Sequence, residues 1–550
     1  MSKEIDCNPF KTIALSLSGG GYRATCFHLG TMCYLDSLSY NDKSLLERAK
    51  VISSVSGGTF VAVIYAECLA KGLGLKECFH RLYHFMTEVD VIGEAFDILK
   101  EKKWDFKKNK NLINAVSIVY RRHLTQECFG VLWNESKSHL TEISFNSTDF
   151  ASGINFRFQK TKDDQGYIGN KYFQEKVEKA KHIRLADIIA TSSCFPGGFE
   201  PILYPDDFMD ENCVDNAQHR MTNKNSVSKR TFPLMDGGIY DNQGIDAVLL
   251  ACDRMRRFYP EHENQEMPID LYIISDVAEG PSKPFVLRKM LFKGRLMSSL
   301  NLNLIMSYSL IVALIILVVM LITKPKAFLI IETLFFSISF FLFLIIFAAK
   351  HCLCSKKLLR MLYIPEVLDV SLKKIFSYNL NTLLLSVYHR ITSLIYMSSS
   401  VFMRQVRRLS IKQIYENEKW EQRRILNAIW DLRKDKVDGR NKDQELGIAY
   451  PSEKILNLTK EAMEMKTTLW FRDEELTGET TMPDKLIVCG QYTCCFNLLQ
   501  YIERLFKSGI CDSLDDAGKR TLELLRKKLR SDWDRFNTDP FWQLAEYKER

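Results

Sequence analysis

The sequence predicts an α/β fold with a mostly parallel central sheet, on three observations. First, residues 8–284 alternate short apolar runs with turns of Gly, Ser and Asp and with amphipathic stretches, a pattern typical of βαβ units. Second, the apolar runs 12–17, 50–55 and 269–275 are short enough for buried strands, and the third ends at Asp276. Third, the two long apolar runs of residues 302–349 have no polar face and therefore belong outside this domain.

Composition excludes some classes of function. The chain has 550 residues and a formal charge of +8, an excess too mild to imply nucleic acid but compatible with an anionic membrane surface. Its 15 cysteines include no CxxC pair, which favours reduced thiols over disulfides. No His, Cys or Asp cluster has metal-ligand spacing, so we expect neither a metal nor a cofactor. The first residues lack an apolar stretch, so we expect no secretory signal.

Residues 302–349 are predicted to form a transmembrane helical hairpin. The runs 304–323 and 327–349 are each close to the ~20 residues that cross a bilayer, and Lys324-Pro325-Lys326 forms the turn. Basic residues are more numerous beside the hairpin than in its turn, which predicts that both soluble parts face the cytoplasm. These flanking residues are Arg288, Lys289, Lys293, Arg295, Lys350, Lys356, Lys357 and Arg360. Glu332 either snorkels to the interface or is a helix-pairing or functional carboxyl.

The remaining sequence has a helical pattern, with a continuation of the soluble part over residues 356–508 and a C-terminal helical tail over 509–550. Within the first segment lies a basic amphipathic stretch that predicts either a solvated helix face or a contact with lipid headgroups. Its charged residues are Arg404, Arg407, Arg408 and Lys412. In the second segment, residues 513–516 resemble a capping box at the start of a charged helix.

A glycine-rich turn follows the first predicted strand, in the order Ser18-Gly19-Gly20-Gly21-Tyr22-Arg23-Ala24. Such a strand-to-helix turn exposes backbone N–H groups and binds negative charge. Two interpretations compete at this point, a dinucleotide-binding turn and an oxyanion hole.

The end of the second strand favours the oxyanion hole. A dinucleotide-binding unit would have an Asp or Glu there, but this strand ends in Ser53-Ser54-Val55-Ser56-Gly57-Gly58. A serine on a tight turn between small residues is the pattern of a nucleophile elbow. Ser54 stands where the usual motif has glycine, and Gly58 fills the second small position.

A third segment supplies a carboxylate. Asp236 follows the apolar pair Leu234-Met235 and precedes Gly237 and Gly238, which predicts a strand end on an open turn. A carboxylate close to a serine hydroxyl can take its proton if burial raises its pKa.

Together the three segments resemble the patatin-like phospholipase family. The resemblance implies a three-layer α/β/α domain and a Ser–Asp dyad without histidine. By position, Ser56 would be the nucleophile and Asp236 the base. The oxyanion hole would comprise Gly19, Gly20 and Gly21, with Arg23 supporting the loop. Ser54 and Ala24 depart from the family pattern, and both are small.

The resemblance extends along the chain. Residues 190–201 and 236–244 look like further family segments, the second one common in bacterial members. Residues 404–409 and 486–492 are similar to late segments of larger bacterial members. The resemblance therefore implies a domain covering residues 8–284 and 356–508, with the hairpin inserted.

These expectations define a membrane-anchored hydrolase of fatty acyl esters, a phospholipase A or lysophospholipase that acts on membrane lipids. Transacylation, which the family also includes, stays open. A histidine base is the mechanistic rival, with His219 and His262 near Asp236 in sequence. The rival from another class is a membrane scaffold with a degenerate hydrolase fold.

Overall fold

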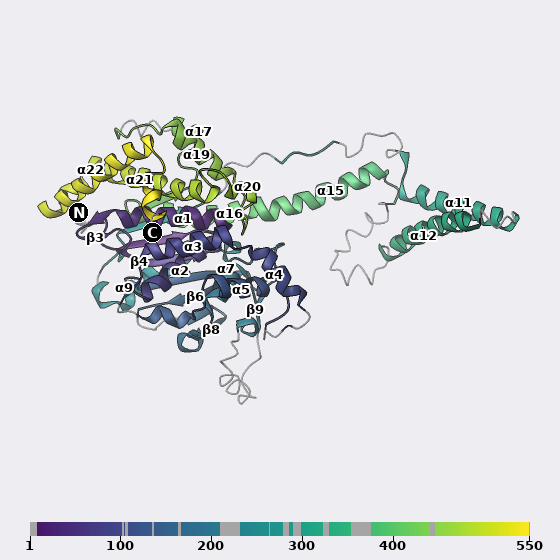
Figure 1. Ribbon diagram of the computed structural model, residues 1–550, viewed down its shortest axis with the longest axis horizontal. Coiled ribbons are helices and arrows are strands. Elements are labelled where there is room, and N and C mark those ends of the chain that lie inside the picture. Colours follow the sequence, from purple (N-terminus) through teal and green to yellow (C-terminus); the bar gives the residue numbers. More distant parts are fainter. Residues whose placement is uncertain are drawn as a thin grey trace, which may run out of the picture. The chain divides into compact units, whose positions relative to one another are not determined.

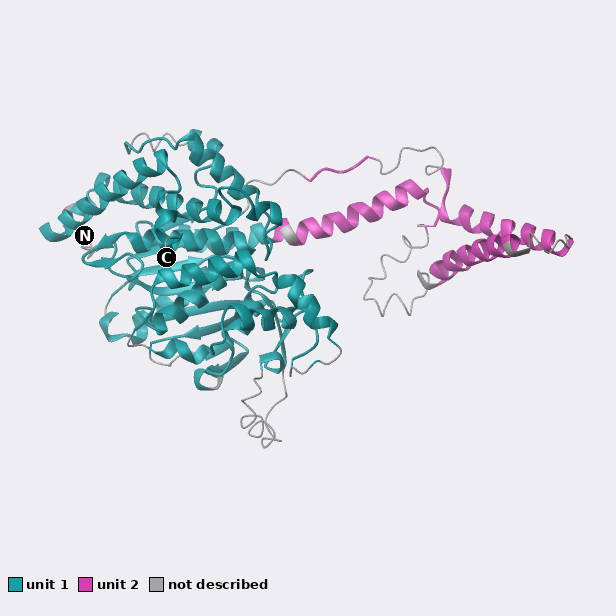
Figure 2. Cartoon of the chain, in the orientation of Figure 1, with its two compact units in different colours: residues 1–282, 403–550 teal, residues 283–402 magenta. Residues whose placement is uncertain are grey.

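The computed structural model divides into two compact units (Figure 2). Unit 1 comprises residues 1–282 and 403–550, and unit 2 comprises residues 283–402. The described residues are 8–101, 104, 108–134, 137–162, 167–208, 231–262, 265–278, 285–289, 299–322, 329–353, 374, 376–439 and 446–548. The predicted hairpin turn, the flanking residues Lys293, Arg295, Lys356, Lys357 and Arg360, and His219 all lie outside them.

A block of five parallel strands forms the centre of unit 1 (Figure 1). Its order is β12-β11-β1-β4-β5, with bounds Arg424–Ala428, Leu271–Asp276, Ile13–Leu17, Ala49–Val55 and Glu142–Asp149. The strands predicted at 12–17, 50–55 and 269–275 are therefore confirmed. Because parallel strands end at one edge of a sheet, the turns after β1, β4 and β11 lie at the same edge.

Antiparallel strands extend the sheet beyond β5 to ten strands in the described part of the chain. β5 pairs with β6, and β6, β7 and β8 follow in sequence order. β10 also pairs with β5, and β9 with β10. The bounds of β6, β7, β8, β9 and β10 are Ile154–Lys160, Tyr167–Asn170, Phe173–Lys176, Ile202–Tyr204 and Phe232–Asp236. A separate small hairpin pairs β2 (Ser39–Tyr40) with β3 (Lys43–Ser44).

Two apolar cores lie on opposite faces of the sheet, as three layers require. Leu15 and Ile273 belong to one core with α1 (Gly21–Ser37), α2 (Gly57–Ala70) and α21 (Met482–Lys507). Their sequence neighbours Ala14 and Ile274 belong to the other core with α9 (Ile245–Phe258) and α16 (Met403–Tyr415). This alternation follows from the two-residue period of a strand. The predicted α/β/α architecture is confirmed.

Helices α1 and α21 run side by side, although they come from opposite ends of the chain (Figure 1). A Cβ on Gly30 would overlap the carbonyl of Ile487, and a Cβ on Gly490 would overlap that of Phe27. The two glycines therefore let the helix backbones touch. The C-terminal segment of unit 1, residues 403–550, thus contributes to the same core as the first strand.

Further helices complete unit 1. Their bounds are α3 Leu75–Glu88, α4 Val91–Lys100, α5 Leu112–His123, α6 Val177–Ala180, α7 Leu185–Ser192, α17 Lys434–Asp438, α19 Glu453–Glu464, α20 Asp473–Leu476, α22 Asp516–Thr538 and α23 Trp542–Lys548. The cap of α22 is Asp515, whose side chain accepts from the amide of Gly518 at 2.7 Å, and not Ser513. The apolar side chains Leu525 and Trp533 of α22 are buried in the first core.

Unit 2 contains a pair of long apolar helices, α11 (Leu302–Ile322) and α12 (Leu329–Leu353), that pack against each other. Both are long and apolar enough to cross a membrane by length and composition, which is weak evidence for insertion. The two ends of the pair meet, because the Lys350 ammonium donates to Asn303 Oδ1 at 2.9 Å. A third helix, α15 (Leu380–Tyr396), begins at the base of the pair, where the amide of Leu380 donates to the carbonyl of Leu300 at 2.7 Å.

Candidate active site

Ser56 occupies a strained strand-to-helix turn. It follows β4 directly and caps α2 with φ 51° and ψ −120°. Positive φ is uncommon for a residue other than glycine, and such strain concentrates at functional sites. The turn is that of a nucleophile elbow. Ser56 is buried except for 7% of its surface, so its hydroxyl lies in a largely desolvated place.

The two flanking positions explain why small residues are needed. A Cβ on Gly58 would overlap the carbonyl oxygen of Leu17 in β1, so α2 begins in direct contact with that strand. Ser54 is accommodated because its hydroxyl hydrogen-bonds with the hydroxyl of Thr59 at 3.1 Å. The serine that departs from the usual motif therefore has a partner inside the turn.

Strand β5 brings Asp236 next to Ser56. Asn146 of β5 is paired with Val55, the residue before Ser56. The next residue, Ser147, is paired with Asp236, the last residue of β10. Two consecutive residues of one strand thus fix the positions of two segments that are far apart in the sequence.

The environment of Asp236 suits a general base. Burial raises the pKa of its carboxyl to about 6, while hydrogen bonds from the Gly238 amide and the Ser56 side chain and the charge of Arg407 lower it. The Gly238 amide donates to Asp236 Oδ1 at 2.7 Å. A carboxylate whose pKa lies close to the working pH can both accept and return a proton. Gly237 is packed so tightly that a Cβ on it would overlap the carbonyl of Asn146.

The predicted oxyanion loop lies beside Ser56, but its three glycines are not equivalent. The amide of Gly19 donates to the carbonyl of Asn242 at 2.9 Å and is therefore already used. Among the described residues, the amides of Gly20 and Gly21 have no hydrogen-bond acceptor. Gly20 and Gly21 have φ values of 151° and 58°, and Gly21 opens α1. Two unused N–H groups thus lie at the positive end of a helix dipole.

Arg23 is buried and ties the loop to other segments. Its guanidinium donates to the carbonyl of Met465 at 2.7 Å and to that of Val277 at 2.8 Å. These bonds connect the first turn of α1 with the residues that follow α19 and β11. They are compatible with the supporting role that the resemblance implied.

The segment 192–194 hydrogen-bonds to the backbone amides of both candidate catalytic residues. The sequence patterns had assigned it no role. The hydroxyl of Ser192 accepts from the amide of Ser56 at 2.9 Å and donates to the carbonyl of Asn146 at 2.7 Å. Two residues later, the carbonyl of Cys194 accepts from the amide of Asp236 at 2.9 Å. In the sequence, the one indication that this segment has a role was the resemblance of residues 190–201 to a family segment. That resemblance does not reveal which residues the segment contacts.

His28 and His262 make their hydrogen bonds with residues other than Ser56 and Asp236. The ring of His262 bonds with the side chain of Gln265 at 2.8 Å. His28 is buried and bonds with the Ser18 carbonyl at 2.9 Å and the Ser275 hydroxyl at 2.8 Å. Burial lowers the pKa of His28 to about 4, so its imidazole is neutral at physiological pH.

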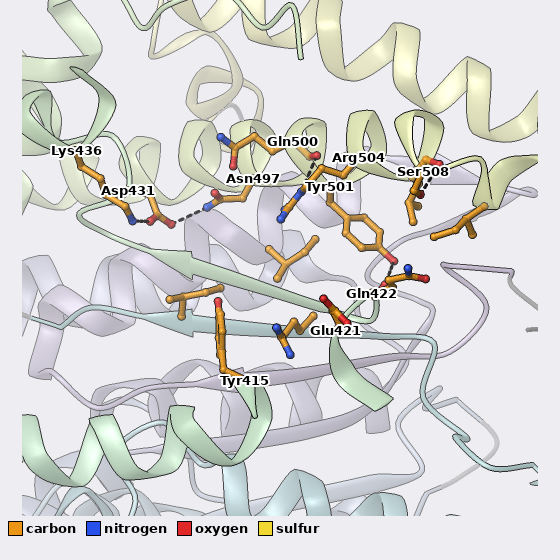
Figure 3. Close-up of a pocket in the computed structure, with 15 residues that line it drawn as sticks. Tyr415, Glu421, Gln422, Asp431, Lys436, Asn497, Gln500, Tyr501, Arg504 and Ser508 are labelled. Carbon is orange, nitrogen blue, oxygen red and sulfur yellow. Dashed lines mark hydrogen bonds and ion pairs between the residues drawn. The ribbon is translucent and has the colours of Figure 1, made fainter. Parts of the chain in front are cut away.

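A separate cavity of about 430 Å³ lies between β12 and α21 and includes neither Ser56 nor Asp236 (Figure 3). Asn497 donates to Asp431 at 2.9 Å on its wall, and Asp431 also pairs with Lys436. Within the described part of the chain, no group of three His, Cys, Asp or Glu side chains is arranged to hold a metal ion.

Fold and site together define an α/β protein in which a serine on a strained strand-to-helix turn lies beside a buried carboxylate. Residues 15–249 match the model of the patatin-like phospholipase family, so this part of the chain is a patatin-like domain. The match includes Ser56 and Asp236 but ends before β11, β12 and α21. A comparison with curated proteins found no match.

Proposed function

We propose that this protein hydrolyses fatty acyl esters of lipids, with Ser56 as nucleophile and Asp236 as its base. The observation that carries the proposal is the pairing of a serine on a strained turn with a buried carboxylate whose pKa is raised to about 6. Backbone strain of this kind has to be offset by the rest of the structure, and it concentrates at functional sites. Together the serine and the carboxylate supply a nucleophile and a proton acceptor.

In the first half of the reaction, Asp236 accepts the Ser56 proton as Oγ attacks the ester carbonyl. The negative charge that develops on the carbonyl oxygen is stabilised by the amides of Gly20 and Gly21 and by the amide of Gly57, the residue after the nucleophile. Collapse of the intermediate breaks the bond to the alcohol, which leaves with the proton held by Asp236. The acyl group remains on Ser56 as an ester.

In the second half, Asp236 takes a proton from water, and the resulting hydroxide attacks the acyl-serine carbonyl. The same amides stabilise the second oxyanion. Release of the fatty acid returns the proton to Ser56 and regenerates the enzyme. An alcohol in place of water would give transacylation, so analysis of the acyl product distinguishes hydrolysis from transfer.

Helices α11 and α12 support a membrane location for the substrate. Their length and apolar composition would anchor the chain in a bilayer, where lipid esters are concentrated. The basic residues beside the pair outnumber those in its turn, which favours a cytoplasmic location of both soluble parts. Phospholipase A activity on such a membrane is the specific form of this proposal.

The deciding experiment is labelling with a fluorophosphonate probe, which phosphonylates activated serines. We expect labelling of the full chain and none of Ser56→Ala, together with loss of hydrolysis of phospholipid vesicles and of a water-soluble ester. Asp236→Asn keeps the shape of the side chain but cannot accept a proton, so its activity should fall by at least about a thousandfold. A folded wild-type protein that neither reacts with the probe nor hydrolyses either substrate would instead identify a degenerate scaffold.

A further inference from the structure

Arg407 belongs to the basic stretch that the sequence placed on a solvated or headgroup-binding face, yet the structure buries its side chain to 14% exposure. The residue lies on α16, the first helix of unit 1 after residue 402. This helix packs against α9 and against the short helix Gly237–Ile239 that follows Asp236. Its apolar residue Ile414 is fully buried in the second core. Helix α16 thus has a fixed place beside the candidate base.

The guanidinium of Arg407 lies between two segments of the site. Its Nη2 donates to the carbonyl of Gly19 at 3.3 Å, and its Nη1 lies 3.7 Å from Oδ1 of Asp276 at the end of β11. Its positive charge also acts on Asp236 and lowers the pKa of that carboxyl. One side chain therefore interacts with the turn after β1 and with the ends of β11 and β10.

Asp276, the acidic partner of Arg407, is itself fixed by hydrogen bonds. The carboxylate accepts from the side chain of Gln243 at 3.1 Å and from the amide of Ala278 at 3.1 Å. It is almost completely buried, so removal of Arg407 would leave a buried negative charge without this cation. Arg407 thus forms an ion pair with Asp276 and a hydrogen bond with the carbonyl of Gly19.

The bond to Gly19 bears on the oxyanion loop because a peptide unit is planar. The carbonyl of Gly19 and the N–H of Gly20 belong to one trans peptide and point in opposite directions. A donor that fixes the carbonyl on one side therefore fixes the direction of the N–H on the other. The amide of Gly20 is one of the two loop amides that lack an acceptor among the described residues.

We propose that Arg407 is a positioning residue of the hydrolase site, which orients the Gly19–Gly20 peptide and places a positive charge beside Asp236. The inference rests on the proposed function of Ser56 and Asp236. It assigns part of the active site to the segment after the apolar helices, outside the residues that match the family model.

The test compares Arg407→Gln with Arg408→Gln. Arg408 is the next residue of the same helix and is exposed. Arg408→Gln removes the same charge as Arg407→Gln, so it controls for the change in net charge and for binding to anionic lipid. Both variants and the wild type are assayed as full chains on an uncharged water-soluble ester between pH 5 and 9. For Arg407→Gln we expect kcat to fall by about 10- to 100-fold with little change in KM, and Arg408→Gln should match the wild type.

The pH profile separates positioning from simple loss of stability. Asp236 faces the Ser56 hydroxyl, the Gly238 amide, the Cys194 thiol and the Arg407 guanidinium. Loss of the arginine removes the only cation of this group, so the pKa of Asp236 rises and the acidic limb of kcat/KM moves to higher pH. Arg407→Lys keeps the charge, so the acidic limb of kcat/KM should return to its wild-type position. A lysine ammonium lacks the planar pair of donor groups that contacts Gly19 and Asp276 together, so the kcat of this variant should stay reduced.

Two results would overturn the proposal. The first is a folded Arg407→Gln protein with the wild-type kcat and the wild-type acidic limb of kcat/KM. The second is a loss of kcat in Arg408→Gln equal to that in Arg407→Gln. If Arg407→Gln does not fold, judged by circular dichroism and thermal melting, Arg407→Lys decides, and a wild-type kcat in that variant refutes the role of the fork. Full activity of Ser56→Ala would instead refute the proposed function itself, so the two failures are distinguishable.

Discussion

Gly19 and Ser56 lie so close that a Cβ atom added to the glycine would be 3.1 Å from the Cβ of the serine. The same added atom would overlap the side-chain oxygen of Asn242. The glycine-rich loop and the turn at Ser56 are therefore in direct contact. This contact is possible because Gly19 has no side chain.

Gly19→Ala tests this contact. The methyl group must displace the side chain of Asn242, Ser56 or the loop, so we expect kcat on a water-soluble ester to fall roughly 10- to 100-fold. Gly74→Ala is the matched control, because a Cβ there meets no atom within 4 Å. Equal activity of the two variants would show that the contact has no role in the reaction.

The pH dependence should report Asp236. In the proposed mechanism only the ionised carboxylate accepts the serine proton, and burial raises the pKa of this group to about 6. Activity should therefore be low at pH 5, rise through about pH 6 and reach a plateau above pH 7, measured as kcat/KM on an uncharged ester. His28, whose pKa burial lowers to about 4, stays neutral over this range and adds no limb. A limb near pH 7 that vanished on substitution of His219 or His262 would indicate a triad.

Ser192→Ala should disturb the elbow without touching the reacting atoms. It removes the acceptor for the Ser56 amide and the donor to the Asn146 carbonyl, and unsatisfied buried groups of this kind cost about 1–3 kcal/mol each. We expect a lower free energy of unfolding and a reduced rate of probe labelling. Ser193→Ala is the control, since Ser193 directly follows α7 and its hydroxyl donates to the carbonyl of Ile189 in that helix at 2.7 Å. Its labelling rate should stay close to that of the wild type.

Replacing residues 304–349 with a short Gly/Ser linker should separate anchoring from chemistry. The hydrogen bond between Lys350 and Asn303 brings the two cut ends together, so a short linker can span them. The shortened protein should remain in the supernatant after centrifugation with vesicles, keep its activity on a soluble ester and lose activity on vesicles. Equal losses on both substrates in a folded protein would show that the apolar pair takes part in the active site.

The C-terminal helix α22 should contribute to global stability. Leu525 is 2% exposed and its neighbour Leu524 is 66% exposed, which makes them a matched pair on one helix. Leu525→Ala should lower the free energy of unfolding by about 2–5 kcal/mol, whereas Leu524→Ala should change it by less than about 0.5 kcal/mol. Chemical denaturation of both variants checks this, and equal effects would mean that α22 does not pack as described.

Features that depend on neighbouring residues could be predicted from the amino-acid sequence alone. Strand and turn patterns are short-range, so the strands before Gly19 and Ser56 and the turn at Gly237 could be predicted from neighbouring residues. The length and composition of the two apolar helices are likewise properties of contiguous sequence. Resemblance to a family then supplied roles for Ser56 and Asp236, which remain predictions.

Contacts between residues far apart in the sequence depend on how the elements pack in the folded protein. The register of β5 brings Ser56 and Asp236 together, and Ser192 holds the elbow from another helix. Arg407 was indistinguishable from Arg408 in the amphipathic pattern, because both lie in the same basic run. The packing of α16 buries the first guanidinium beside Gly19 and leaves the second exposed, and no local pattern records that difference.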